Sequence, residues 1–351
     1  SQLHQANVLL TDRTPDLEEL AERGQRLRRA KFKQYIANPL SLKLPLFDPD
    51  PLVGAVVRGV PPGAWRWLLA AWALLILVGA GLVAMHWGEL TADITARVFT
   101  SENMLILALV YPLLKAFHEF GHALAVRALG GHCREMGLMF LVFIPVPYVD
   151  ASESVTLPNK WQRMLVGAAG MIAELGRAAI AVWLWTAVSG GVTQAVLHQV
   201  VILAGVTTLV FNANPLLRFD GYFILSDALE IPNLAQRANR YVGYLARRYL
   251  FRAEARPPLH LTRREPLWLT AYALGSVVYR TLVTLSIIVL IAGQFFVFGV
   301  LLALWAGYGL VVQPLVKYLR FVARDPALEG HRRHATLFSI GLAGLVTAFI
   351  A

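Results

Sequence analysis

The sequence predicts an all-α polytopic membrane protein with about seven transmembrane helices and a small membrane-associated β-hairpin. Two observations carry this prediction. The chain of 351 residues is 57% hydrophobic and only 15% charged, with a mean hydropathy of +0.55, whereas soluble globular proteins carry about 25% charged residues. Apolar runs of about 20 residues, the length needed to cross the hydrocarbon core of a bilayer, also recur along the chain.

Residues 1–63 form the first predicted segment, a cytoplasmic or interfacial lead-in that lacks the features of a secretory signal peptide. Residues 17–35 are basic and partly amphipathic, so they are expected to form either a helix on an anionic membrane surface or a solvated linker helix. Six prolines between residues 39 and 62 favour irregular structure in the rest of the segment.

The membrane-embedded core is predicted to occupy residues 64–334. Its candidate spans are residues 65–87, 104–129, 161–188, 192–213, 267–291 and 295–316. A further apolar run at 335–351 is short, and it is expected to begin a final helix that leads to a C-terminal region beyond this sequence. Residues 136–150 are apolar and β-prone but contain Pro145 and Pro147, which favours a hairpin within 138–149 over a helix.

The distribution of basic residues predicts the orientation. Lys and Arg number ten in residues 1–66, nine in 214–266 and five in 317–334, against one, Arg97, in the intervening loops. Because cytoplasmic loops carry the excess of Lys and Arg, the N-terminus is predicted to be cytoplasmic. The same distribution accounts for the net charge of +10 without nucleic acid as a partner, since the basic residues flank apolar segments.

A His-Glu-Phe-Gly-His motif at residues 118–122 lies inside the second apolar run. Residues four apart share one helix face, so His118 and His122 can offer imidazole nitrogens to one zinc ion. Glu119 is placed to take a proton from a water that the metal activates. Ionisable groups are costly at bilayer depth, and a metal site gives a reason for them. The alternative is a polar helix face that hydrogen-bonds to neighbouring spans.

A third ligand is required, because catalytic zinc sites use three protein ligands and one water. The single cysteine, Cys133, excludes a multi-cysteine site. Asp220 is the best candidate: Asn214-Pro215 ends the fourth span, and Asp220-Gly221 opens a turn that can point a carboxylate back into the bundle. The alternative is that Asp220 caps a short helix at 222–230. Asn212 and Asn214 are expected to satisfy backbone groups freed by Pro215, although Asn214 could instead support Asp220 by hydrogen bonding.

These motifs together resemble the site-2 protease family of intramembrane zinc metalloproteases. The resemblance covers residues 65–350 and includes HEFGH in a span, the Pro-rich hairpin, and Asn-Pro followed by Asp-Gly. FNANPLLRFDGYFILSD followed by EIPNL is similar to a bacterial branch of peptide zinc metalloproteases, which carries a hemolysin-D-like adaptor domain after one more span. The resemblance implies zinc held by His118, His122 and Asp220, with Glu119 as general base, in a bacterial cytoplasmic membrane.

One position departs from the family pattern. Site-2 proteases often carry Ala-Gly-Pro-x-x-Asn in the third core helix, whereas this chain has Glu174 in place of the Asn, after Ala169-Gly170. Glu174 is therefore expected to play one of three parts. It could donate to a substrate oxyanion if protonated, bind the metal as a fourth ligand, or pair with Arg177 one helical turn on.

The expected function is zinc-dependent endopeptidase activity on membrane-associated or exported peptides, with the substrate held extended along the hairpin edge. The expected partners are the lipid bilayer, the peptide substrate and components of an export system. The alternative is a membrane component of a peptide export apparatus in which proteolysis is secondary or absent. A di-iron oxygenase or desaturase is disfavoured, because it would need many more clustered histidines.

Overall fold

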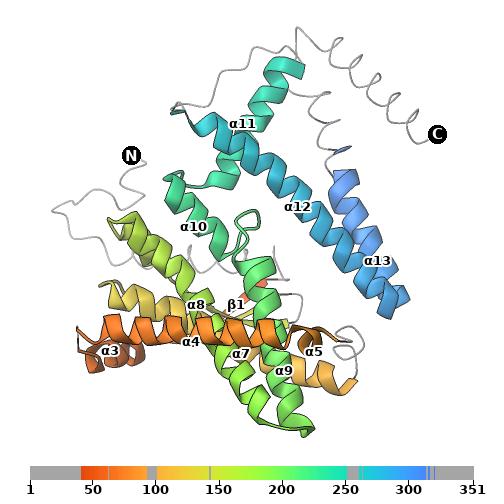
Figure 1. Ribbon diagram of the computed structural model, residues 1–351. Helices are drawn as coiled ribbons and strands as arrows, with labels where there is room; N and C mark the ends of the chain where they lie inside the picture. Colours follow the sequence, from red (N-terminus) through yellow and green to blue (C-terminus); the bar gives the residue numbers. More distant parts are fainter. Residues whose placement is uncertain are drawn as a thin grey trace, which may run out of the picture.

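A computed structural model describes residues 41–61, 63–92, 101–141, 144–250, 261–262, 264–313, 315–316 and 320. The described chain is mostly helical and contains a three-stranded sheet (Figure 1). Its α-helices are α3 (Asp50–Gly59), α4 (Trp65–Met85), α5 (Trp87–Thr91), α7 (Ser101–Ala128), α8 (Lys160–Ala187), α9 (Gly191–Val206), α10 (Asp220–Leu229), α11 (Leu234–Leu245), α12 (Glu265–Gln294) and α13 (Phe296–Gly307). A 3-10 helix, η1 (Ser152–Thr156), and the π-helical segments η2 (Thr207–Asn212), η3 (Ala246–Leu250) and η4 (Tyr308–Val312) complete the described helical part.

Four helices of the described chain are long and apolar enough to cross a membrane: α4, α8, α9 continued by η2, and α12. They correspond to the predicted spans 65–87, 161–188, 192–213 and 267–291, which supports the predicted membrane character. Helix α7 is continuous over the second predicted span, and α13 and η4 follow one another over 295–316. The run at 335–351 and the helix predicted at 17–35 lie outside the described residues. The count of about seven spans and the orientation stay predictions.

The predicted hairpin is present as β2 (Met136–Leu141) and β3 (Ile144–Val149), which pair antiparallel from Met136↔Val149 to Leu141↔Ile144. A third strand, β1 (Ser41–Phe47), pairs with the other edge of β2. The expectation of irregular structure was therefore wrong for Ser41–Phe47, and also for Asp50–Gly59, which form helix α3. Pro45 is tolerated because β1 is an edge strand and its register shifts between Pro45 and Phe47.

Helix α3 follows β1 and packs against α7, so part of the predicted lead-in belongs to the folded body. Val53 of α3 is fully buried together with Ala123 and Val126 of α7. Asp50, the first residue of α3, accepts from the backbone N–H of Cys133 at 3.3 Å and lies 3.0 Å from Nδ1 of His132. These contacts fasten α3 to the loop that follows α7.

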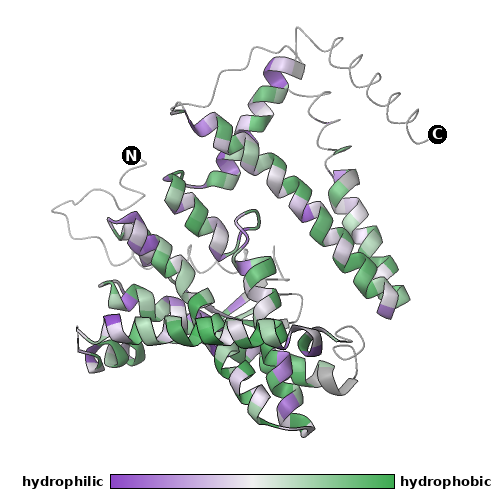
Figure 2. Ribbon diagram, in the orientation of Figure 1, coloured by the Kyte–Doolittle hydropathy of each residue, from purple (hydrophilic) through white to green (hydrophobic). Residues whose placement is uncertain are grey.

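Helix α8 is central to one half of the molecule, where it contacts α4, α7, α9 and α10 (Figure 1). Small residues allow the close approach of α7 and α8: a Cβ on Gly121 would stand 2.9 Å from the carbonyl oxygen of Ala169. Helices α11 and α12 pack on each other in the other half, where Tyr222 of α10 joins the buried Leu234 and Leu269. Hydrophobic residues cover α4, α12 and α13, while hydrophilic ones gather at the start of α8 and in α11 (Figure 2).

Candidate metal centre

His118 and His122 lie on one face of α7, and only 2% and 7% of their surfaces are exposed. Their rings meet edge to face with centroids 4.9 Å apart, and their Nε2 atoms are 3.2 Å apart. The spacing of four residues therefore brings two imidazole nitrogens to one point inside the protein, as the helical period predicts.

Asp220 is the first residue of α10, and its carboxylate reaches both imidazoles. Oδ2 lies 3.0 Å from Nε2 of His118, and Oδ1 lies 3.5 Å from Nε2 of His122. The start of α10 requires glycine at 221, because a Cβ there would stand 2.5 Å from the carbonyl oxygen of Ala213. Asp220 does not cap the helix: Phe219 occupies the N-cap position, and no side chain caps α10.

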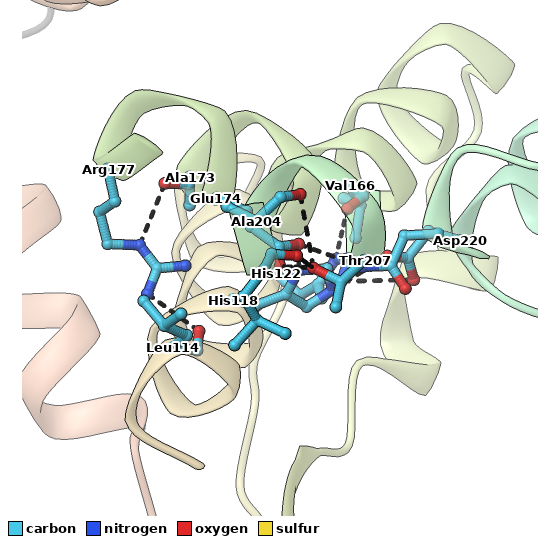
Figure 3. A network of polar contacts seen from close by, with 12 residues as sticks. Leu114, His118, His122, Val166, Ala173, Glu174, Arg177, Ala204, Thr207 and Asp220 are labelled. Carbon is cyan, nitrogen blue, oxygen red and sulfur yellow. Dashed lines mark hydrogen bonds and ion pairs between the residues drawn. The ribbon is translucent and has the colours of Figure 1, made fainter. Parts of the chain in front are cut away.

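The other ring nitrogen of each histidine is held by an acceptor (Figure 3). Nδ1 of His122 donates to the carbonyl oxygen of Val166 at 2.7 Å, and Nδ1 of His118 donates to Oε2 of Glu174 at 3.0 Å. A neutral imidazole carries one proton, so each Nε2 is left with a lone pair. Two such nitrogens and the Asp220 carboxylate therefore converge as acceptors.

The burial of Asp220 agrees with this assignment. Although Oδ2 is close to His118, it is buried and has no hydrogen-bond partner in the described chain. One atom each from His118, His122 and Asp220 lies within 4.8 Å of the others, an arrangement that could hold a metal ion. Converging acceptors repel one another unless a cation lies between them, so the donor set fits a metal.

Glycine at position 170 of α8 leaves the room that the two rings occupy. A Cβ on Gly170 would stand 2.5 Å from Nε2 of both His118 and His122, much closer than ordinary van der Waals contact. The rings cannot easily move away, because their Nδ1 atoms are tethered to Glu174 and Val166. Residue 170 therefore sets how close α8 comes to the imidazoles.

Glu119 faces a cavity of about 590 Å³ that reaches His122 and Asp220. Its Oε2 accepts from the backbone N–H of Val149 at the end of β3, at 3.2 Å. Most of the remaining cavity lining comes from the segment after β3, the start of α8, and α10 with the turn after it, including Ser152, Ser154, Arg163, Tyr222, Phe223, Ser226, Asp227 and Asn233. Arg163 bridges two of these walls through an ion pair with Asp227, 2.8 Å long.

Glu174 is 98% buried and points at His118 rather than at Arg177. Arg177 instead donates to the carbonyl oxygens of Leu114 and Ala173, at 2.9 and 3.2 Å (Figure 3). The expected pair between Glu174 and Arg177 is therefore absent from the described contacts. Nor is Glu174 in the group of three residues whose ligand atoms converge.

Asn214 does not contact Asp220 in the described hydrogen bonds; its Oδ1 accepts from the backbone N–H of Leu216 at 2.8 Å and shapes the turn. Its neighbour Asn212 is the amide that joins the site, donating from Nδ2 to Oε2 of Glu174 at 3.1 Å. Thr207 also places its hydroxyl against Oε1 of Glu174. The sequence analysis missed Thr207, and it assigned Asn212 to backbone groups freed by Pro215 rather than to the site. Their shared position near the end of a predicted span is the signal that could have drawn attention to both.

Comparisons with protein-family models, curated proteins and solved structures find no match to this chain.

Proposed function

We propose that this chain is a zinc-dependent endopeptidase of the membrane, similar in design to the site-2 proteases. The observation that carries the proposal is the convergence of two tautomer-fixed imidazoles and one carboxylate beside a glutamate. The donor set of two nitrogens and one oxygen is typical of catalytic zinc sites, which leave one position open for water or substrate.

The spacing of these atoms supports zinc quantitatively. With ligand bonds of about 2.05 Å, the edge of a tetrahedron around zinc is about 1.63 times longer, or about 3.3 Å. The two Nε2 atoms are 3.2 Å apart, which is close to this edge. The Asp220 carboxylate reaches them through different oxygens, Oδ2 at 3.0 Å from His118 and Oδ1 at 3.5 Å from His122. When bound, zinc would supply Lewis acidity that makes water nucleophilic at neutral pH and polarises a peptide carbonyl.

Glu119 is the proposed general base and acid. The backbone N–H of Val149 holds one oxygen of its carboxylate, which leaves the other available to the cavity. This oxygen would take the proton of the attacking water and then return it to the leaving amine. The hydrogen bond from Val149 therefore places Glu119 beside the end of β3.

The sheet edge next to Glu119 supports an extended peptide as substrate. In β3, the backbone groups of Val146 and Tyr148 face β2, so those of Pro145, Pro147 and Val149 face the outer edge. Proline has no N–H and Val149 N–H is bound to Glu119, so this edge offers carbonyl acceptors. A peptide held there would donate its own N–H groups to Pro145 and Pro147.

The proposal includes a bacterial cytoplasmic membrane as the location, with the N-terminus in the cytoplasm, and peptides destined for export or anchored in the membrane as substrates. An export scaffold without proteolysis is the competing function. Zinc content separates the two, because a scaffold has no need of a bound metal.

The experiment uses the purified full chain in proteoliposomes, with zinc content measured by mass spectrometry and cleavage followed on a proteome-derived peptide mixture. Glu119→Gln should retain stoichiometric zinc and lose cleavage, whereas His122→Ala and Asp220→Ala should lose both. Glu89→Gln, an exposed glutamate remote from the centre, is the control. The proposal fails if Glu119→Gln cleaves as well as the control or if the unaltered protein binds no zinc.

A further inference from the structure

We infer that Glu174 is a positioning residue for the proposed centre: it fixes the tautomer of His118 and supplies the second negative charge that a divalent cation needs there. This inference rests on the proposed function. It also gives a role to the residue that departs from the site-2 protease pattern.

The contacts of Glu174 are those of an acceptor. Oε2 accepts from Nδ1 of His118 at 3.0 Å and from Nδ2 of Asn212 at 3.1 Å. The hydroxyl of Thr207 lies against Oε1 and also 2.8 Å from the carbonyl oxygen of Leu203. The Thr207 hydroxyl can donate its proton either to Oε1 of Glu174 or to the carbonyl oxygen of Leu203. In both cases Oε2 of Glu174 accepts from His118, which keeps the His118 proton on Nδ1 and leaves Nε2 unprotonated.

A π-helical turn brings the two supporting residues onto one carboxylate. Thr207 and Asn212 are the first and last residues of η2. In an α-helix, with 100° per residue, positions five apart would differ by about 140° around the axis. A π-helix closes its turns between residues i and i+5, as in the bond from Ala213 N to Thr208 O at 2.7 Å. Positions five apart are then neighbours on one face, as positions four apart are in an α-helix. The π-helical turn therefore places the side chains of Thr207 and Asn212 against the same carboxylate, that of Glu174.

The charges of the groups that touch the imidazoles also balance. Glu174 is 98% buried and Asp220 is partly buried, and the two carboxylates contact opposite nitrogens of the His118 ring. Two carboxylates in one low-dielectric site are costly when nothing compensates them. Two neutral imidazoles add no charge, so the two carboxylates match one divalent cation. Without the metal, the same two charges repel each other.

This arrangement leaves Glu174 no part in donating to a substrate oxyanion. An ionised carboxylate has no proton to donate. If the group were neutral, its proton would lie on Oε1 and face Thr207, because Oε2 already accepts two hydrogen bonds. The glutamate at this position therefore has His118, rather than a substrate oxyanion, as its partner.

The charge contribution predicts opposite effects on the metal-free and metal-bound protein. Glu174→Gln keeps the shape and an acceptor for His118, so it removes the charge alone. We expect zinc affinity to fall about 10-fold, at the lower end of the 10–100-fold typical of residues that support metal ligands. The melting temperature of the metal-free protein should stay the same or rise, because carboxylate repulsion is relieved. If the charge of Glu174 instead stabilised the metal-free fold through its hydrogen bonds, Glu174→Gln would lower that temperature.

Two further variants separate the tautomer from the charge. Glu174→Met also removes the acceptor, so we expect about 100-fold weaker zinc binding. Asn212→Leu touches neither imidazole and should weaken binding several-fold, but should add less in the Glu174→Gln background because both act through the same carboxylate. Gln199→Met alters a buried polar residue of α9 that has no described contact with Glu174, and should leave affinity unchanged.

The readouts are zinc affinity by chelator competition, the visible spectrum of the Co²⁺-substituted protein and thermal unfolding of the full chain in detergent. A shift in the Co²⁺ bands of Glu174→Met would report a changed ligand geometry without any assay of activity. Equal zinc affinity of Glu174→Gln, Glu174→Met and the Gln199→Met control would overturn the inference while leaving the proposed function intact. Absence of zinc from the unaltered protein would instead refute the proposed function.

Discussion

Gly170→Ala adds one methyl group at the point where α8 faces both imidazoles, and it tests whether the metal centre depends on this close approach. The added Cβ would lie 2.5 Å from Nε2 of His118 and of His122. The shortest ordinary contact for such an atom is about 3.4 Å, so rings or helix must give by about 0.9 Å.

That displacement is large for a metal site. Ligand distances in such sites hold to within about 0.2 Å, and the rings are tethered at Nδ1 by Glu174 and Val166. We therefore expect zinc affinity to fall by at least 100-fold, or about 2.7 kcal/mol at 1.36 kcal/mol per tenfold. Replacing glycine by alanine inside a helix favours the helix by about 1 kcal/mol, so a loss of affinity would not reflect a poorer helix.

The assay is zinc binding by chelator competition, with helix content measured by circular dichroism on the same samples. Gly81→Ala in α4 is the matched control, since a Cβ there would have nothing within 4 Å. If Gly170→Ala bound zinc as tightly as Gly81→Ala, the rings would have to be free to move, and the description of a preformed centre would be refuted.

Two further predictions concern the loop after α7. Burial, with the nearby Asp150 and Asp50 carboxylates adding to it, raises the pKa of the Cys133 thiol to about 11. The thiolate fraction at pH 8 is then about one in a thousand, and iodoacetamide should label the folded protein far more slowly than the SDS-unfolded chain; equal rates would contradict this. The hydrogen bond with His132 and that from the Cys133 backbone lower the pKa of Asp50 below its ordinary 3.8. A depressed pKa gives stability that is present above the ordinary value and is lost as the pH falls through the folded value, so Asp50→Asn should lower the melting temperature at pH 7 and the difference should shrink below about pH 4. A constant difference across that range would rule out the linkage.

The histidine pair could be predicted because its geometry is local. A spacing of four residues on a helix places His118 above His122 whatever the rest of the chain does. Asp220 lies in another helix, so periodicity alone could not place it. Its prediction relied on Asn-Pro and Asp-Gly as signs of a break and a new turn, and the structure brings its carboxylate to both rings.

The partner of Glu174 could not be predicted, because it depends on how α8 is rotated against α7. Arg177 was a reasonable local partner, being one helical turn away. The close packing at Gly121 and Gly170 instead turns Glu174 towards His118. A π-helical turn then supplies Asn212 and Thr207, and such a turn has no reliable signature in a single sequence.

Strand β1 was missed for a related reason. Ser41–Phe47 contains Pro45 and follows a basic segment, which reads as a loop. What makes it a strand is a partner: Gly137 of β2 lets the carbonyl oxygen of Leu44 come so close that a Cβ there would collide with it. Edge strands of this kind are decided by tertiary pairing rather than by their own composition.

The cavity indicates from which side of the membrane water and substrate would reach the proposed centre. Gly170 lies roughly ten residues into α8, which corresponds to about 15 Å at 1.5 Å per residue, or half of a 30 Å hydrocarbon core. The cavity bridges this depth, because its lining runs from Glu119 and His122 to Arg163, Asp227 and Asn233 near the polar start of α8. Water and an extended peptide would therefore reach the centre from that end. In the proposed orientation this end is cytoplasmic, so an exported substrate would meet Glu119 before it crosses the membrane.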